Sequence, residues 1–437
     1  MKVLLVTMYW PPAGGGGVQR PLKLATHLPA LGIETHVLAP DDPKWLHRDE
    51  ELRPPTQAFV HRARYLGPRA RLPSEELHGL SGTDLTLAKA RLAYRRLLLP
   101  DASVTWAATA VPAALRIVKR EGIDAVITTS PPVSMNLIGA AVQRLAGIVW
   151  VADQRDSVLQ NADRRFDRKA VQAKEKALER VVRLVAEHAD GVVTVSEFIA
   201  DEVRGFDPKG PVRVIPNGSD FDDFAGLEYR PGDRFRITHT GSFFGKRNPR
   251  AFLTALAETG LDDVVARFVG DFRAADREWI PELDLGDRLE LLEYVPHRRA
   301  LELQRDSEVN LLLLPEAAGR GRVVPSGKIF EYLAAERPIL AAVPTDGAAA
   351  ELVRETGSGI VVAPDDVKGI REALLGLHAR WRAGKLQDGH LTDEQRRRLS
   401  REARVEELAE LLWSLNWGAA CGAVLRPCGL CPRGRRK

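Results

Sequence analysis

Four consecutive glycines stand near the start of the chain, between the apolar run MKVLLVTMYW and a segment of helical period. They are Gly14, Gly15, Gly16 and Gly17. A strand, a glycine loop and a helix in this order suit anion binding, because glycine lets backbone N–H groups approach a ligand and the helix N-terminus adds partial positive charge. Taken alone, the same run is equally typical of a flexible loop.

Two familiar nucleotide-binding motifs do not fit this loop. The dinucleotide fingerprint places its glycines directly after the strand, whereas residues 9–13, with two prolines, intervene here. The Walker sequence ends in Gly-Lys-Ser or Gly-Lys-Thr, whereas this run continues as Val18, Gln19 and Arg20. The sequence therefore disfavours a nicotinamide cofactor and excludes a P-loop ATPase.

A second glycine loop, in HTGSFFGKRNPRAFLTAL, repeats the layout in the other half of the chain. Its candidate ligand-binding residues are Gly241, Ser242, Lys246 and Arg247. Asn248 as a cap and Pro249 in the first turn predict a helix directly after the two cations. Two cations beside a positive helix end are unfavourable unless an anion, such as a phosphate, joins them. The alternative is a solvated basic turn.

A third candidate lies in the stretch VVPSGKIFEYLAAERPILA. The residues at its predicted helix start are Ser326, Gly327 and Lys328. Glu331 is expected in the first turn, where a carboxylate commonly only complements the helix dipole. Because this loop follows the apolar run VNLLLLP, it leaves the carboxyl end of a predicted strand, where open α/β sheets bind ligands. Glu331 is then placed to accept hydrogen bonds from vicinal hydroxyls.

The elements that must position these loops alternate between strand-like and helix-like segments, which is the pattern of parallel sheets covered by helices. The predicted strands are KVLLVTMY, ETHVLAP, DAVITTS, IVWVAD, GVVTVS, VRVIP, FRITHTG, ARFVGD, RLELLEYV, VNLLLLP, PILAAV and GIVVAP. Residues 41–103 are rich in Pro and Arg without clear periodicity, so we expect a long excursion there. The sequence predicts an α/β fold of two Rossmann-like, doubly wound domains in tandem.

The alternation also divides the chain into units. We assign residues 1–228 to an N-terminal domain and residues 229–393 to a C-terminal domain. A helix at 394–417 is expected to cross back and brace the first domain. Residues 418–437 have no usable period, and we expect a loosely ordered basic tail there.

Composition narrows the class of function. The 437 residues are 44% hydrophobic, enough for two domains with cores of their own. Because 63 Lys and Arg nearly balance 59 Asp and Glu, the net charge of +4 gives no reason to invoke a nucleic-acid partner. No apolar run approaches the roughly 18 to 20 residues that span a bilayer. We expect a cytoplasmic protein that at most rests on a membrane surface.

Two smaller signals concern the membrane and metals. The stretch ARLAYRRLLLP, residues 90–100, mixes Arg with Leu and Tyr, which suits either a membrane or lipid-pyrophosphate contact or an ordinary helix with a solvated arginine face. The cysteines Cys421, Cys428 and Cys431 all lie in the tail. They cannot staple the body of the protein, and three thiols without a histidine do not complete a structural zinc site.

Taken in order along the chain, these motifs resemble the retaining glycosyltransferases of family four, over roughly residues 1–382. The resemblance rests on GGVQR, TSPPVSMNLIGAA, VADQRDS, TVSEFIADEV leading to VIPNGSDFDDF, GSFFGKRNP, and PSGKIFEYLAAERPIL. It implies the two-domain GT-B fold with the domains facing a cleft, a nucleotide-sugar donor held mainly by the second domain, and a glycan or lipid-linked acceptor held mainly by the first.

The resemblance also implies roles for single residues. Lys246 and Arg247 would neutralise the diphosphate of the donor, and Glu331 would bind the ribose hydroxyls. The glycine loop would approach the diphosphate and sugar across the cleft, since bare backbone can close on crowded oxygens. As the bond to the leaving diphosphate stretches, Lys246 would stabilise the growing negative charge. The sugar would be transferred with retention, with no cofactor and no obligatory metal.

The chain departs from the family pattern at the strand end VADQRDS. Many members carry a His before an Asp there, whereas this chain has Arg155 before Asp156. With Lys246, these two are the candidate catalytic residues. If they line the cleft, the contact of the usual histidine with the sugar is absent or made differently; the alternative is a salt-bridged loop pair.

A second departure concerns the sugar hydroxyls. Many members have two glutamates separated by seven residues, the second of which matches Glu331, but Val323 stands at the first position here. Glu316 is the nearest carboxylate in the sequence, and residues 325–328 are the other candidates for this contact.

The leading hypothesis is a retaining glycosyltransferase of the hexosyltransferase type that acts in surface polysaccharide or glycolipid biosynthesis. The first alternative is a nucleotide-sugar epimerase on the same fold, which would form its product without an acceptor. The second is a non-catalytic subunit that binds a sugar nucleotide but never turns it over.

Overall fold

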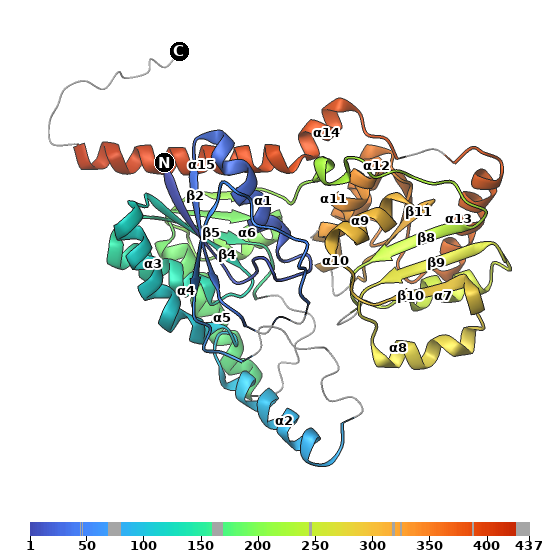
Figure 1. Ribbon diagram of the computed structural model, residues 1–437, viewed down its shortest axis with the longest axis horizontal. Coiled ribbons are helices and arrows are strands. Elements are labelled where there is room, and N and C mark those ends of the chain that lie inside the picture. Colours follow the sequence, from blue (N-terminus) through green and yellow to red (C-terminus); the bar gives the residue numbers. More distant parts are fainter. Residues whose placement is uncertain are drawn as a thin grey trace.

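The computed structural model contains two α/β units, each built on a parallel sheet, with the chain passing between them (Figure 1). The structure describes residues 1–43, 45, 47–68, 80–159, 169–243, 247–316, 320–323, 326–386 and 389–424. The predicted fold class, two Rossmann-like domains, is confirmed by this architecture.

The N-terminal sheet has seven strands in the order β3-β2-β1-β4-β5-β6-β7. They are β1 (Lys2–Thr7), β2 (Glu34–Pro40), β3 (Phe59–Ala63), β4 (Ala125–Ser130), β5 (Val149–Gln154), β6 (Gly191–Thr194) and β7 (Val212–Val214). All its paired strands run parallel. β1, β4, β5 and β6 are buried almost throughout, because helices cover both faces of a parallel sheet.

The α-helices of the described part of this domain are α1 (Gln19–His27), α2 (Gly82–Leu97), α3 (Ala107–Glu121), α4 (Met135–Ala146), α5 (Lys169–His188) and α6 (Glu197–Arg204). The expectation of a patternless excursion at 41–103 is wrong in part, because the segment contributes β3 and α2. β3 is an edge strand with a mostly exposed or half-buried pattern, so it lacks the alternation that reveals a strand.

The C-terminal sheet has six parallel strands in the order β10-β9-β8-β11-β12-β13. They are β8 (Phe235–Thr240), β9 (Val264–Val269), β10 (Leu289–Leu292), β11 (Val309–Leu313), β12 (Ile339–Ala342) and β13 (Gly359–Val362). The helices are α7 (Arg250–Ala257), α8 (Ala274–Trp279), α9 (His297–Arg305), α10 (Arg320–Val323), α11 (Gly327–Ala335), α12 (Ala348–Thr356) and α13 (Val367–Arg382). Each predicted strand of this half coincides with one observed.

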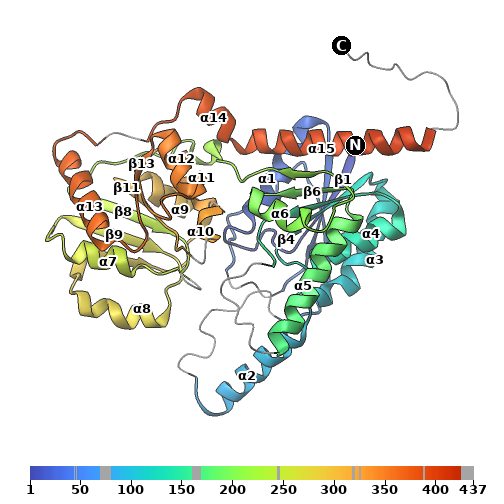
Figure 2. The same cartoon turned by 180° about the vertical axis from the view of Figure 1, so that it is seen from behind.

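Two final helices, α14 (Asp393–Leu399) and α15 (Arg401–Val424), follow the second sheet (Figure 2). α15 contacts α1, β5 and β6, and its buried Leu408 and Leu412 join the N-terminal core. Arg401 at its start binds Asp220 (Nη2 to Oδ2, 3.1 Å) in the crossing segment. The expectation of a loose tail from residue 418 is wrong for residues 418–424, since the small residues there continue the helix. Residues 425–437 lie outside the described part of the chain.

Short 3-10 helices cover Leu28–Leu31, Val104–Trp106, Phe221–Phe224, Ile280–Leu283 and Gly286–Arg288. Within the described residues, no helix is both long enough and apolar enough to cross a bilayer.

Candidate functional site

The strand order of each sheet indicates where a ligand can bind. In the N-terminal sheet the order reverses between β1 and β4, and in the C-terminal sheet it reverses between β8 and β11. Open α/β sheets bind ligands outside the carboxyl ends of strands at such points. Both the four-glycine loop, which follows β1, and the loop from Gly241, which follows β8, leave their sheets at these points.

Gly241 makes room for a lysine from a different helix. A Cβ atom added at Gly241 would lie 2.2 Å from Cε and 2.6 Å from Nζ of Lys328. The φ of Gly241 is +126°, a conformation that side chains rarely adopt, so glycine is required twice over. Ser326 occupies the cap position of α11 and Gly327 is its first residue. The structure thus places the Lys328 ammonium over the end of β8, in the first turn of α11.

The surroundings of Lys328 disfavour its charged form. Burial, and then the nearby Arg247 guanidinium, lower the pKa of Lys328 to about 7, and the Glu331 carboxylate offsets only part of this shift. Among the described residues, no carboxylate lies within ion-pairing distance of the Lys328 ammonium. The same positive field acts on His239, whose burial and proximity to Lys328 depress its pKa to about 3, so that it is neutral and donates from Nδ1 to the Leu311 carbonyl (2.8 Å). An anion bound here would favour the charged form of Lys328.

Glu331 lies in the second turn of α11, not in the first as expected, because the helix begins at Gly327. Its Oε2 accepts from Nε2 of Gln304 (2.9 Å), and its Oε1 lies 3.5 Å from Nε2 of His297. Burial opposes ionisation, yet these two neighbours and Lys328 hold the pKa of Glu331 below its usual value. Burial likewise disfavours a charged His297, but the Glu331 carboxylate outweighs it and raises the His297 pKa. Glu331 is therefore a fixed, ionised acceptor near the cationic cluster.

A second glycine, which the sequence reading missed, supports the same loop. Gly270 follows β9 with a φ of +128°, and a Cβ there would lie 2.9 Å from the carbonyl carbon of Gly241. The next residue, Asp271, accepts from Oγ of Ser242 (3.0 Å) and donates its N–H back to that Oγ (3.1 Å). The only sequence signal was the Gly-Asp pair at the end of ARFVGD.

The four glycines of the first loop differ in how closely other residues pack against them. A Cβ at Gly14 would lie 2.1 Å from Oη of Tyr294, a residue of the C-terminal domain, and a Cβ at Gly17 would lie 3.3 Å from the ring of Tyr9. Gly15, with a φ of +87°, and Gly16 have no atom of the described residues within 4 Å of the added Cβ. The ends of the loop are therefore packed, and no described residue packs against the added Cβ positions of its middle.

Arg155 is used to hold backbone. Its guanidinium donates to the carbonyls of Ser130 (3.1 Å), Gly17 (2.9 Å) and Pro131 (3.4 Å). It thereby ties the glycine loop to the loop after β4. Asp156 is exposed, and the structure shows no ion pair between these two described residues, so the salt-bridged alternative is wrong.

A buried ion pair that the sequence reading missed anchors the same face. Arg20 donates from Nε and Nη2 to the carboxylate of Asp153, at 2.9 to 3.1 Å, and also to the carbonyls of Ile215 and Pro216. Both side chains of the pair are almost inaccessible, at 6% and 1% exposed. The sequence GGVQR places Arg20 at the start of α1 but gives no sign of a partner 133 positions away.

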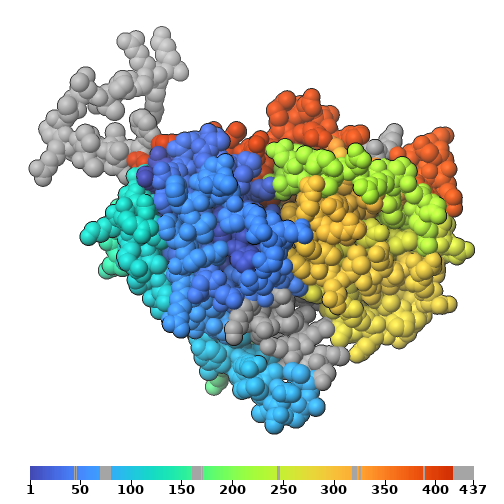
Figure 3. Space-filling view, in the orientation of Figure 1, coloured from blue at the N-terminus to red at the C-terminus, as the bar shows by residue number. Residues whose placement is uncertain are grey.

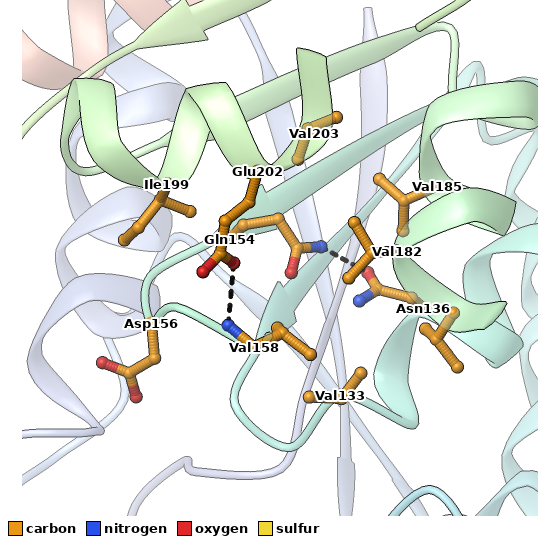
Figure 4. Close-up of a pocket in the computed structure, with 11 residues that line it drawn as sticks. Val133, Asn136, Gln154, Asp156, Val158, Val182, Val185, Ile199, Glu202 and Val203 are labelled. Carbon is orange, nitrogen blue, oxygen red and sulfur yellow. Dashed lines mark hydrogen bonds between the residues drawn. The ribbon is translucent and has the colours of Figure 1, made fainter. Parts of the chain in front are cut away.

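A small pocket lies behind the loop that carries Arg155 and Asp156 (Figure 4). It is lined mostly by valines, and among the described predicted site residues Asp156 alone borders it. Glu202 of α6 accepts from the Val158 N–H (3.0 Å) and from Oγ of Ser157, and Gln154 donates to Oδ1 of Asn136 (3.0 Å). These contacts fix the loop from within the N-terminal domain.

The structure thus brings one group of predicted residues together: Gly241, Ser242, Arg247, Lys328 and Glu331. Lys246 lies outside the described residues. Asn248 does not cap α7 as expected: Pro249 holds that position, and Asn248 accepts from the Arg250 N–H (3.1 Å). Glu316, the candidate for the second sugar carboxylate, pairs instead with Arg322 (3.1 Å).

A comparison with family models matches residues 15–218 to the glycosyl transferase 4-like domain. This match confirms the resemblance over the N-terminal domain. No curated protein sequence matches the chain.

Solved structures with a similar fold include the following three. Sucrose-phosphate synthase from Thermosynechococcus elongatus superposes with a TM-score of 0.67 at 18% identity, covering 96% of this chain and 99% of that one. A glycosyltransferase from Rickettsia africae gives 0.57 at 14% identity, covering 95% and 98%. Anabaena HepE, in complex with UDP and glucose, gives 0.54 at 15% identity, covering 97% and 100%. The two-domain fold is shared along the whole chain.

Proposed function

We propose that this chain, whose residues 15–218 form a glycosyl transferase 4-like domain, transfers a sugar from a nucleotide-sugar donor to a glycan or lipid-linked acceptor with retention of configuration. One observation carries the proposal: Lys328 lies over Gly241 at the start of a helix, without a counter-anion among the described residues, one turn before an ionised Glu331. A diphosphate followed by a ribose fits that order of charges.

The residues take the following roles in this proposal. Lys328, Arg247 and the N-terminus of α11 bind the diphosphate, because cations and backbone N–H groups attract its oxygens. Glu331 accepts hydrogen bonds from the ribose hydroxyls. Lys246, for which the sequence suggests the same task as Arg247, is a further proposed diphosphate ligand.

Catalysis follows from the same charges. As the bond between sugar and diphosphate breaks, negative charge accumulates on the leaving oxygens, and fixed cations stabilise that state more than the ground state. The proposal needs neither cofactor nor metal for this step. Gly15 and Gly16, open on their free side, offer backbone to the sugar from across the cleft.

The acceptor is proposed to bind on the N-terminal side, near exposed Asp156. Arg155 takes part by position: it fixes the end of the glycine loop and the loop after β4. This assigns Asp156, not Arg155, to contact with substrate.

We also propose that α2 contacts a cytoplasmic membrane surface, which would bring the enzyme to a lipid-linked acceptor of polysaccharide or glycolipid synthesis. α2 projects from the N-terminal domain (Figures 1 and 2), and its Leu87, Tyr94 and Leu97 are 51%, 50% and 78% exposed. These side chains recur at helical spacing among Lys89, Arg91, Arg95 and Arg96. An exposed apolar stripe with flanking cations suits anionic lipid.

Thermal unfolding with a panel of UDP-, GDP-, ADP- and dTDP-sugars and their diphosphates tests the donor proposal, since a ligand that binds the native state raises its melting temperature. We expect stabilisation by one nucleotide in the wild type and loss of it in Lys328→Met. Lys368→Met, on the surface of α13, is the matched control. Equal stabilisation of all three proteins would contradict the assignment.

Product analysis separates the alternatives. A transferase releases nucleotide only as sugar reaches an acceptor, whereas an epimerase changes the sugar nucleotide without one. A putative UDP-N-acetylglucosamine 2-epimerase from Listeria monocytogenes has the same fold at 12% identity and a TM-score of 0.52, so the fold itself does not decide. A chain that binds the nucleotide without either reaction is the non-catalytic subunit.

Co-sedimentation with vesicles tests the membrane proposal. We expect binding to phosphatidylglycerol but not phosphatidylcholine vesicles, and its loss in Leu87→Glu and Tyr94→Glu. Leu145→Glu, on α4 and 65% exposed, controls for added charge at an exposed leucine of the same domain. Equal binding of the vesicles by all variants would mean that α2 does not contact the membrane.

A further inference from the structure

Residues 47–49 hydrogen-bond to the start of the glycine loop. Arg48 pairs with Ala13 in an antiparallel bridge. The Gly14 N–H donates to the His47 carbonyl (3.0 Å), and the Asp49 N–H donates to the Pro12 carbonyl (2.9 Å). The two segments therefore form a short ribbon, and whatever positions one positions the other.

His47 reaches from this ribbon into the C-terminal domain. Its Nε2 lies 2.9 Å from Oδ2 of Asp271, the carboxylate that also accepts from Ser242. Its ring stacks on Tyr294 with centroids 4.3 Å apart and planes 12° apart. His47 thus contacts the loops after β9 and β10. Through Asp271 it is also linked to Ser242 in the predicted donor loop.

Asp49 makes the second contact between the domains. It follows His47 by two positions in an extended segment, so the two side chains point to the same face. Asp49 is 1% exposed, and its Oδ2 accepts from the N–H of His297 (2.8 Å), the first residue of α9. A carboxylate at a helix N-terminus is favoured by the helix dipole. The imidazole of this same His297 lies against Glu331.

These contacts join the two domains beside the glycine loop. In Figure 3, blue residues of the N-terminal domain adjoin orange residues of the C-terminal domain. Tyr294 fills the space that a side chain at Gly14 would need, while Gly15 and Gly16 stay open. The ribbon therefore holds one end of the loop against the C-terminal domain and leaves the middle of the loop uncovered.

We propose that His47, Arg48 and Asp49 form a latch that positions the glycine loop over the donor when the domains close, with His47 and Asp49 as positioning residues. The inference rests on the proposed function, because the surface that the latch meets is the proposed donor site. Closure of the domains then affects two residues of that site. Ser242 is reached through Asp271, and Glu331 is reached through His297.

Asp49→Asn separates the latch from the local fold. Oδ1 of Asp49 accepts from the N–H groups of Glu51 (3.1 Å) and Leu52 (3.2 Å), which an asparagine oxygen can also do. Its NH₂ group would then face the N–H of His297, donor against donor. Glu50→Gln, a neutralised neighbour whose side chain is 68% exposed, is the matched control, and His47→Gln is an independent second variant.

Small-angle X-ray scattering of the full chain provides the first arm of the test. We expect a larger radius of gyration for Asp49→Asn and His47→Gln than for the wild type and Glu50→Gln, with similar melting temperatures. His47→Gln combined with Asp271→Asn should open the domains no further than either alone, since both remove one contact. Wild-type dimensions in both latch variants would overturn the proposal.

Titration with UDP-glucose and with UDP provides the second arm. Loss of a charge-assisted hydrogen bond should weaken UDP-glucose on the order of tenfold, and UDP less, because the glycine loop faces the sugar. A merely structural defect would weaken both equally, and that result would overturn the positioning role. If the wild type binds neither compound while scattering still separates the variants, the donor proposal fails and the latch between the domains stands.

Discussion

The two domains use their cations in opposite ways. On the N-terminal face, Arg20 is satisfied by Asp153 and carbonyls, and Arg155 is satisfied by three carbonyls. On the C-terminal face, Lys328 is half-buried beside Arg247 and has no counter-anion among the described residues. Residue type does not distinguish a cation that holds the fold from one that awaits a ligand; its partners do.

The largest effect is expected from the N-terminal face. Arg20→Met leaves Asp153 buried without its partner, which should cost about 3 to 5 kcal/mol of unfolding free energy. Urea unfolding followed by tryptophan fluorescence measures this change, since Trp10, Trp106 and Trp150 are buried in that core. Arg116→Met, at an exposed position of α3, should change little. Equal stability of the two variants would mean that Arg20 does not anchor the face.

Lys328→Met should have the converse effect. It should weaken nucleoside diphosphate binding by roughly 1.5 to 3 kcal/mol, about tenfold to a hundredfold, as for the loss of a charged hydrogen bond. Stability should not fall, because burial already disfavours the ammonium. Calorimetric titration and thermal unfolding of one preparation measure both. If Lys328→Met lost stability but kept its affinity, Lys328 would stabilise the fold and would not bind the diphosphate.

Glu331→Gln tests the ribose contact beside the cationic cluster. Replacing a charged acceptor with a neutral one should lower the affinity about tenfold. The loss should be smaller for 2′-deoxynucleotides, which present one hydroxyl fewer. An equal loss for the ribo and deoxy compounds would place the ribose elsewhere.

The pH dependence of diphosphate binding is a further test of the role of Lys328. Lys328 has a pKa of about 7 without ligand, and a bound diphosphate raises it. Below pH 7 the lysine is protonated in both states and affinity is flat. Above pH 7 binding must take up a proton, so affinity should fall by up to about tenfold per pH unit until the bound-state pKa is reached. Titrations from pH 6.5 to 9 should show this slope in the wild type and lose it in Lys328→Met.

The smallest effect on diphosphate affinity is expected for Arg155→Lys. A lysine can retain one of the carbonyl contacts but not the planar fork that reaches three, so stability should fall by about 1 kcal/mol per lost hydrogen bond. Thermal unfolding measures the loss. A diphosphate affinity that falls as far as in Lys328→Met would move Arg155 into the donor site.

The fold was largely predictable, because fully buried parallel strands such as β4 and β5 are continuous apolar runs between helical segments. The edge strand β3 was missed because its pattern is not regular. α15 was anticipated from its period, but its end was not, since alanine-rich small residues give no clear stop.

The site was predictable only where its signal is local. The helix start at Ser326 to Lys328 could be predicted from residues adjacent in the sequence. Arg20 with Asp153, and Gly14 against Tyr294, could not, because each pair joins residues more than a hundred positions apart. Glu331 was placed correctly near the helix start, yet its partners His297 and Gln304 come from another helix.

Titration of the wild type and Lys328→Met with one nucleoside, its diphosphate and its diphosphate sugar tests the central claim most directly. The account predicts that the wild type binds the two diphosphate compounds far more tightly than the nucleoside, and that Lys328→Met loses most of this difference while Lys368→Met keeps it. If Lys328→Met discriminates as well as the wild type does, the diphosphate does not bind at the end of β8, and the assignment of the C-terminal face is wrong.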